Sequence, residues 1–136
     1  MIRVLVAEDA RPVRETLVAL LGLQDDIEVA AAVASGDQVL PAALTCRPDV
    51  ALLDIGLPAT DGITAAGQLS ERLPACRVLI VTGLDAPGSL AAAVHAGVSG
   101  YLLKDRPAGD LIRAIRAVAR GERVIDARLA GRAPGW

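Results

Sequence analysis

The fold is decided by one stretch, Val50-Ala51-Leu52-Leu53-Asp54, which runs into Ile55-Gly56-Leu57-Pro58. Four consecutive apolar residues bounded by turn-forming residues predict a strand that is buried on both faces, as in a parallel sheet. Aspartate is disfavoured in strands, so the position of Asp54 at the end of this run needs a reason. It is either a local cap or turn at the strand exit, or a functional carboxylate.

The composition suits one domain. The chain has 136 residues, 53% of them hydrophobic and none of them Phe, so the core must be built from Ala, Val, Leu and Ile. A chain of this size buries roughly two thirds of its unfolded surface, which is enough for a stable core without disulfides or a structural metal. The net charge of −2, from 14 basic and 16 acidic residues, gives no reason to expect that this chain itself binds nucleic acid.

Cysteine usage and hydropathy indicate the cellular compartment. Cys46 and Cys76 have no CxxC or zinc-type spacing, and we expect them to be small buried hydrophobic residues in a reducing cytosol. The N-terminus enters a strand directly, without a signal-peptide core, and no apolar run reaches transmembrane length. We therefore expect a cytoplasmic protein with no membrane partner.

Outward from this stretch, apolar periodicity predicts five strands that alternate with five helices. The strands are expected at 2–7, 27–33, 50–54, 77–82 and 100–103. The helices are expected from about Pro12 to Gly22, after Ser35, from about Gly62 until Pro74, from 89 to 96, and from Pro107. This alternation predicts βαβ units, and therefore an α/β fold with a parallel sheet and helices on both faces.

Two segments carry further expectations. Pro41 is awkward inside the second helix, which should start late or be kinked there. The last helix should turn its arginines outward or toward its C-terminal end. Residues 121–136 contain one short apolar patch, Val124-Ile125, and are expected to be a linker or a terminal tail.

Side chains with site chemistry follow four of the predicted strands. Glu8 and Asp9 follow the first strand, Asp54 the third, Thr82 ends the fourth, and Lys104 follows the fifth. Ligands bind beyond the carboxyl ends of the strands in open parallel sheets, so these side chains should share one edge. Each alone has an ordinary explanation, as a helix cap, a strand residue or a solvated charge. Their joint placement favours a functional site.

The chemistry of this set is coherent. Carboxylates held close together resist ionising together unless a cation neutralises them, and a hard ion such as Mg²⁺ (or Mn²⁺) prefers oxygen ligands. An aspartate can attack phosphorus and form an acyl phosphate, whose oxygens then need neutralising groups. The sequence thus predicts that Asp54 is a phosphoacceptor, with the Lys104 ammonium and the Thr82 hydroxyl beside the phosphoryl group.

From residue 2 to about 120, the chain resembles the receiver domain of bacterial two-component response regulators. The resemblance rests on the ordered residues above, on Tyr101 shortly before the lysine, and on the signature Asp54-Ile55-Gly56-Leu57-Pro58-Ala59-Thr60-Asp61-Gly62. It implies a flavodoxin-like (CheY-like) doubly wound sheet of five parallel strands in the order 2-1-3-4-5, with five helices.

Two stretches are similar to one subfamily. Gly100-Tyr101-Leu102-Leu103-Lys104-Asp105 looks like NarL/LuxR-type regulators, including desaturase-controlling ones, whose output domain is a C-terminal helix-turn-helix. Residues 124–130 resemble the start of that subfamily's linker. We therefore assign 1–120 to the receiver domain and 121–136 to a linker toward a missing DNA-binding domain, or to the end of a single-domain regulator. The Pro87-Gly88 start of the fourth helix departs from the family and should loosen that helix.

The resemblance implies a phosphorylation switch. A sensor histidine kinase would phosphorylate Asp54, Thr82 and Lys104 would bind the phosphoryl group, and Tyr101 would turn toward the core. The altered surface would promote homodimerisation, and DNA would be bound only through the output domain. The metal ligands implied by the family pattern are Glu8, Asp9, Asp54 and the backbone carbonyl of Gly56.

Three other classes remain as alternatives. A phosphohydrolase with an Asp nucleophile usually has a second Asp two residues later, but Gly56 stands there and can transfer no proton, so steady turnover is not expected. A nucleotide-binding module would need a GxGxxG or Walker loop after the first strand, and this sequence has neither. A pseudo-receiver that acts only by contact would have no need of all five site residues.

Overall fold

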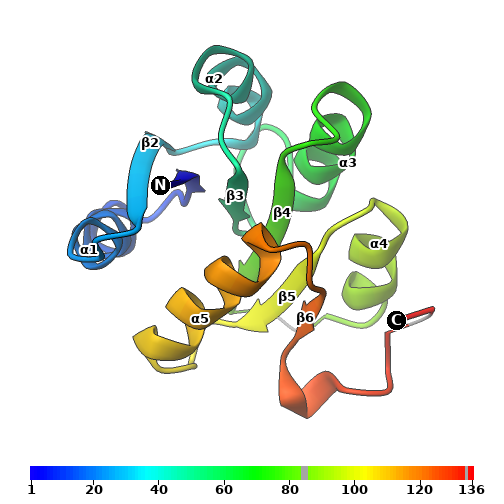
Figure 1. Cartoon of the computed structure of the whole chain (residues 1–136). Coiled ribbons are helices and arrows are strands. Elements are labelled where there is room, and N and C mark those ends of the chain that lie inside the picture. The colour runs from blue at the N-terminus through cyan, green and yellow to red at the C-terminus, as the bar shows by residue number, and fades with distance from the viewer. Residues whose placement is uncertain (84–85, 134) are drawn as a thin grey trace.

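A parallel sheet forms the middle layer of the molecule, with helices on both of its faces (Figure 1). The computed structural model describes residues 1–83, 86–133 and 135–136. The expected loop 83–88 and the tail include residues 84–85 and 134, which lie outside the described residues. The strands are β1 Ile2–Ala7, β2 Ile27–Val33, β3 Val50–Leu53, β4 Arg77–Thr82, β5 Gly100–Leu103 and β6 Val124–Ile125. The helices are α1 Arg11–Gly22, α2 Val39–Cys46, α3 Gly62–Arg72, α4 Ser89–His95 and α5 Ala108–Ala119, with short 3₁₀ turns η1 Gly36–Gln38 and η2 Ala127–Leu129.

The strand order is β2-β1-β3-β4-β5-β6, and each adjacent pair is parallel. This confirms the five predicted strands and their order. The expectation of a five-stranded sheet is wrong, because the predicted tail contributes a sixth strand.

The central strand β3 is buried on both faces, as its apolar run predicts. Ala51 and Leu53 lie in a hydrophobic cluster with residues of α2, α3 and α4. Val50 and Leu52 belong to a second cluster, which contains residues of α1 and α5. The sheet therefore separates two aliphatic cores, and the end of β3 emerges between helices at one edge.

The helix boundaries follow local sequence signals. Helix α2 begins only at Val39, so Pro41 occupies its first turn, where its missing N–H costs little. The late start that we expected is confirmed. The carboxylate of Asp61 accepts a hydrogen bond from the Thr64 N–H at 2.9 Å and caps α3. Gly97, just after α4, has a φ of +92°, a left-handed conformation that favours glycine.

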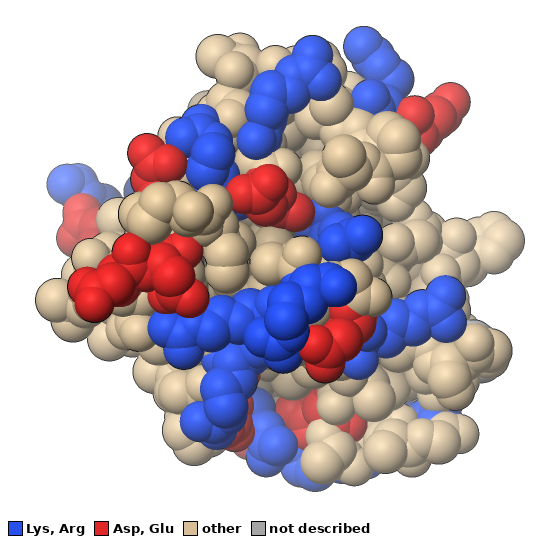
Figure 2. Space-filling view, in the orientation of Figure 1, with Lys and Arg blue, Asp and Glu red and all other residues tan. Residues whose placement is uncertain are grey.

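The outer surface of α5 is charged. Figure 2 shows basic and acidic side chains interspersed on the face of the molecule that carries this helix. Arg116 binds the carboxylate of Asp26 through Nε at 2.8 Å and Nη2 at 2.9 Å, and Arg120 pairs with Glu122 at 2.6 Å. The arginines of the last helix therefore face outward, as predicted, and Arg116 ties α5 to the connection before β2.

The sixth strand was missed because it is only two residues long. Val124 lies beside Gly100 and Ile125 beside Tyr101 of β5. After it, Asp126 is buried at 1% exposure and Leu129 at 2%. A two-residue patch carries no periodicity that could distinguish a strand from a loop. Residues 124–129 are thus part of the folded domain.

We expect the Asp126 carboxylate to make stability depend on pH. Its hydrogen bond from Arg128 holds its pKa below the ordinary value of 3.8. A carboxyl group whose pKa is lower in the folded chain adds stability above its unfolded pKa and loses that contribution as the pH falls through its folded pKa. The difference in unfolding free energy between the wild type and Asp126→Asn should therefore shrink below about pH 4. Urea unfolding at several pH values measures this difference, and a constant difference would contradict the expectation.

Strain in the connection between β3 and α3 gives a second prediction. Ala59 has a φ of +69°, in the left-handed region, which costs an L-residue roughly 1–2 kcal/mol. Ala59→Gly removes this cost but adds freedom to the unfolded chain, so it should raise the unfolding free energy by about 0.5–1 kcal/mol. Ala19→Gly, on the exposed side of α1, is the control and should lower stability. Urea unfolding that ranks the two variants equally would show that Ala59 is not strained.

Candidate functional site

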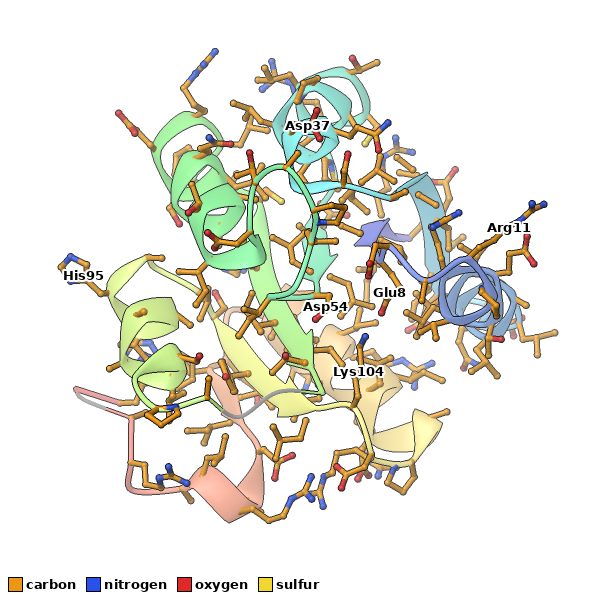
Figure 3. All side chains as sticks on the ribbon, turned by 180° about the vertical axis from the view of Figure 1, so that it is seen from behind. Glu8, Arg11, Asp37, Asp54, His95 and Lys104 are labelled. Carbon is orange, nitrogen blue, oxygen red and sulfur yellow. The ribbon has the colours of Figure 1, made fainter. Side chains whose placement is uncertain are left out.

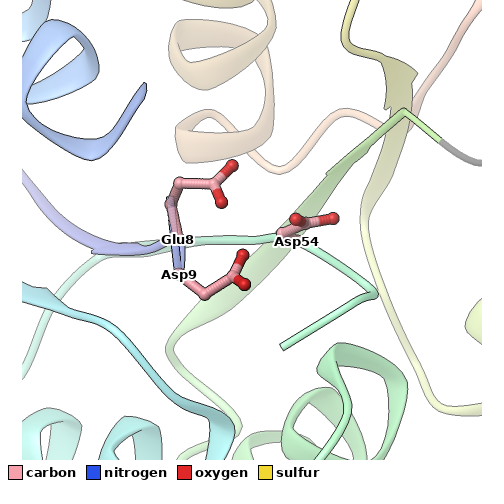
Figure 4. A group of neighbouring side chains, drawn as sticks. All are labelled: Glu8, Asp9 and Asp54. Atoms are coloured by element: carbon pink, nitrogen blue, oxygen red, sulfur yellow. The ribbon is translucent and has the colours of Figure 1, made fainter. Parts of the chain in front are cut away.

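Three carboxylates meet at the carboxyl edge of the sheet. Oxygen atoms of Glu8, Asp9 and Asp54 lie within 4.8 Å of one another (Figure 4). They meet because β1 and β3 are adjacent and in register, with Ala7 beside Leu53, so both strands end at the same level. The Asp54 N–H donates to the Ala7 carbonyl at 3.2 Å and continues this pairing by one residue. The predicted convergence of these side chains is thus found.

Glu8 is the buried member of the cluster, at 2% exposure. One of its carboxylate oxygens accepts a hydrogen bond from the Ala10 N–H at 3.1 Å, and the other accepts one from the Lys104 ammonium. A buried carboxylate is stable only with such partners. Glu8 therefore depends on Lys104, which lies 96 positions away in the sequence.

Lys104 bridges the carboxylates that follow β1 and β3. Its Nζ lies 3.0 Å from Oδ2 of Asp54 and also contacts Glu8, and Figure 3 shows the three side chains converging at the sheet edge. Burial acts to lower the pKa of Lys104, but the hydrogen bonds to Glu8 and Asp54 outweigh burial, so the pKa lies above its ordinary value. The side chain is therefore a fixed positive charge beside Asp54.

Close backbone packing positions Asp54. The Gly62 N–H donates to the Ile55 carbonyl at 2.9 Å, and a Cβ on Gly62 would come within 2.1 Å of the Asp54 carbonyl oxygen. The Asp-Gly pair in the signature thus has a physical cause. Asp61 caps α3, and Gly62, which has no Cβ, leaves room for the Asp54 carbonyl at the end of β3. Gly36 is similar, because its Cβ would lie 1.6 Å from the Thr60 carbonyl oxygen.

Sequence reasoning missed Arg14. From α1, its Nη1 donates to the Glu8 carbonyl at 2.7 Å and lies 3.5 Å from the Asp9 carbonyl. It therefore holds the backbone of the acidic pair, not the carboxylates. The available signal was an arginine about one helical turn after Asp9, which also fits an ordinary surface residue.

Thr82 and Gly56 lie next to the cluster. Thr82 is buried at the end of β4, and its carbonyl accepts a hydrogen bond from the Lys104 N–H at 2.9 Å. The Gly56 N–H donates to Oδ1 of Asp54 at 3.3 Å. The role of the Thr82 hydroxyl and that of the Gly56 carbonyl remain predictions.

Tyr101 lies away from the carboxylates, in the cluster that packs against α2, α3 and α4. Its exposed fraction is 0%. The ring is therefore inside the protein in this conformation, and its rotation on phosphorylation stays a prediction.

The donor set fits a hard divalent cation. It consists of carboxylate oxygens, and no cysteine or histidine belongs to the cluster, so Mg²⁺ or Mn²⁺ suits it better than zinc.

In the described part of the chain, no helix is both long enough and apolar enough to cross a membrane.

The fold and the site define a class of protein. Residues 4–116 match the family model of the response regulator receiver domain, and the chain belongs to this family. Several relatives carry the names of transcriptional regulators, and solved structures of a NarL receiver domain and of a LuxR-family regulator also match the chain. The transcriptional regulatory protein DesR of Bacillus subtilis (strain 168) is 38% identical over 91% of this chain and 61% of its own length.

Two further comparisons agree with this assignment. The DNA-binding transcriptional activator DevR/DosR of Mycobacterium tuberculosis is 35% identical, over 96% of this chain and 60% of its own. A crystal structure of a LuxR-family DNA-binding response regulator from Staphylococcus aureus has a TM-score of 0.83 at 28% identity, covering 88% of this chain and 99% of the other. The chain spans about three fifths of the length of the curated relatives named here.

We expect Lys104 to oppose metal binding. Its ammonium lies beside two of the three clustered carboxylates, so it repels a cation and already neutralises part of their charge. Lys104→Ala should therefore bind Mg²⁺ about tenfold more tightly, as judged by isothermal titration calorimetry. Lys104→Arg keeps the charge and is the control. An affinity for Mg²⁺ that is unchanged or weaker in Lys104→Ala would contradict this account.

Proposed function

We propose that this chain is a phosphorylation-dependent signalling switch in which Asp54 accepts a phosphoryl group from a sensor histidine kinase. One observation carries the proposal: the carboxylate of Asp54 lies beside an acidic pair and beside the Lys104 ammonium at one sheet edge. A nucleophilic carboxylate beside a fixed positive charge is what phosphoryl transfer to aspartate requires.

In the proposed reaction, an oxygen of Asp54 attacks the phosphorus of a phosphohistidine. The new P–O bond forms as the P–N bond breaks, and the histidine leaves. Lys104 then pairs with one phosphoryl oxygen, and the Thr82 hydroxyl donates to another. Mg²⁺ bound by Glu8, Asp9, Asp54 and the Gly56 carbonyl would supply positive charge to the phosphoryl group.

The chain is proposed to be a phosphoacceptor and not a turnover enzyme. Two residues after Asp54, where a phosphohydrolase carries its proton-transferring carboxylate, stands Gly56. Hydrolysis of the acyl phosphate would then depend on water alone, and the phosphoryl group would persist long enough to carry a signal.

The output is proposed to be a change of surface and of association. The Lys104 N–H binds the Thr82 carbonyl, so a phosphoryl group that attracts both side chains acts on the ends of β4 and β5 together. The charge biases a population of conformations toward one that forms a homodimer. Named relatives are transcriptional regulators. By analogy, the receiver domain, which the sequence places at residues 1–120, would extend through the packed segment 124–129, and the residues after it would lead to a DNA-binding domain of a longer cytoplasmic protein.

The decisive measurement uses beryllofluoride, which mimics the phosphoryl group on aspartate. With Mg²⁺ and beryllofluoride, the wild type should change from monomer to dimer in light scattering, and Asp54→Asn should not, because it lacks the acceptor oxygen. A small-molecule phosphoryl donor should likewise give acid-labile phosphate in the wild type only. Labelling of Asp54→Asn would overturn the assignment of the acceptor, and an unchanged mass in the phosphorylated wild type would remove dimerisation.

A further inference from the structure

The segment after β6 is bound to the end of β5 through one carboxylate. The Asp126 N–H donates to the Tyr101 carbonyl at 2.8 Å, and Oδ2 of Asp126 accepts a hydrogen bond from the Leu103 N–H at 3.2 Å. The side chain of Asp126 thus takes the place of the next backbone carbonyl of β6. Its exposed fraction is 0%, so this contact is shielded from water.

A second contact reaches the residue directly after Lys104. Arg128 binds both carboxylate oxygens of Asp105, through Nη1 at 2.8 Å and Nη2 at 2.6 Å. The same guanidinium donates from Nε and Nη2 to Asp126, at 3.0 Å each. The hydrogen bonds from Arg128 hold the pKa values of Asp105 and Asp126 below their ordinary range, as expected for ionised partners.

Residues 126–129, which we name the strap, are also anchored by packing. Leu129 is buried in the same cluster as Tyr101 and Leu90 of α4. Arg106, on the other side of Asp105, has its Nε 3.5 Å from Asp126. An isolated exposed ion pair contributes little to stability. Here the bidentate contact of Arg128 with Asp105 has a defined geometry, and Arg128 also shares the buried Asp126 carboxylate with Arg106.

The strap therefore contacts both neighbours of Lys104 in the sequence. Leu103 is fixed through its N–H by Asp126, and Asp105 is fixed through its carboxylate by Arg128. Between them, Lys104 projects to Glu8 and Asp54. The clustered carboxylates that fit a metal ion follow β1 and β3 instead, and the strap makes none of the contacts described above with these strand ends.

We propose that Asp126 and Arg128 are positioning residues, which hold Lys104 where it meets a phosphoryl group on Asp54. This inference rests on the proposed function. Coupling between two sites is reciprocal. A phosphoryl mimic that binds better while the strap contacts Leu103 and Asp105 therefore also stabilises those contacts. The chain beyond residue 129 then responds to whether Asp54 carries a phosphoryl group.

The test separates binding of the phosphoryl mimic from binding of the metal. In the full chain, Arg128→Gln and Asp105→Asn should each weaken the affinity for beryllofluoride, at saturating Mg²⁺, by about five- to tenfold. Their affinity for Mg²⁺ alone should be unchanged or slightly tighter, because the carboxylate ligands stay in place. Arg120→Gln breaks a comparably exposed pair with Glu122 and should change neither affinity.

The double variant Asp105→Asn/Arg128→Gln should be no weaker than Arg128→Gln alone, because Arg128→Gln already removes the contact with Asp105. If the losses of beryllofluoride affinity in the two single variants add up in the double variant, or if the affinities for Mg²⁺ and beryllofluoride fall equally, the strap is only a general stabilising element. Wild-type affinity for beryllofluoride in both single variants and in the double variant would overturn the proposal and leave the proposed function intact. If the wild type itself binds Mg²⁺ but not beryllofluoride, the proposed function fails first.

Hydrogen exchange tests the reciprocal effect. Adding beryllofluoride should slow exchange of the Leu103 and Arg128 amides, which both donate to Asp126, in the wild type but not in Asp54→Asn. Unchanged exchange at these amides, with beryllofluoride shown to be bound, would contradict the coupling.

Discussion

The structure depends on one charge placed between two others, the Lys104 ammonium between Glu8 and Asp54. A buried glutamate next to two further carboxylates would be costly without a cation. The lysine can serve both strands only because β5, β1 and β3 are parallel and their carboxyl ends share one edge. The aliphatic cores on the two faces of the sheet fix that arrangement, so packing far from the site sets its electrostatics.

The parts of this arrangement that follow from periodicity could be predicted from the sequence. The apolar run before Asp54 indicates a strand buried on both faces, and alternation with helices indicates a parallel sheet. Parallel strands bring their ends together, so Glu8, Asp9, Asp54 and Lys104 could be grouped without coordinates. Which of their atoms pair could not be predicted, because the sequence does not say that Glu8 is buried while Asp9 is exposed.

Features that depend on tertiary contacts were missed or expected wrongly. The two residues of β6 have too little local pattern, and only the free edge of β5 makes them a strand. Arg14 binds backbone carbonyls, which no spacing of charged residues reveals. The sequence shows that Tyr101 is aromatic and near Lys104, but only its membership of the buried cluster that includes Leu129 and Leu90 shows that its ring lies inside.

The pairing of β5 with β6 has a consequence for self-association. An unpaired strand edge is a template on which another chain can add a strand, and folded proteins guard against it with very short edge strands or with charge. Here the backbone of β5 is matched by two residues of β6 and then by the Asp126 carboxylate. A carboxylate in place of a carbonyl ends the ladder, and the Arg128 and Arg106 side chains lie against it. This side of the sheet is thereby protected from runaway strand addition, the first step toward fibrous aggregates.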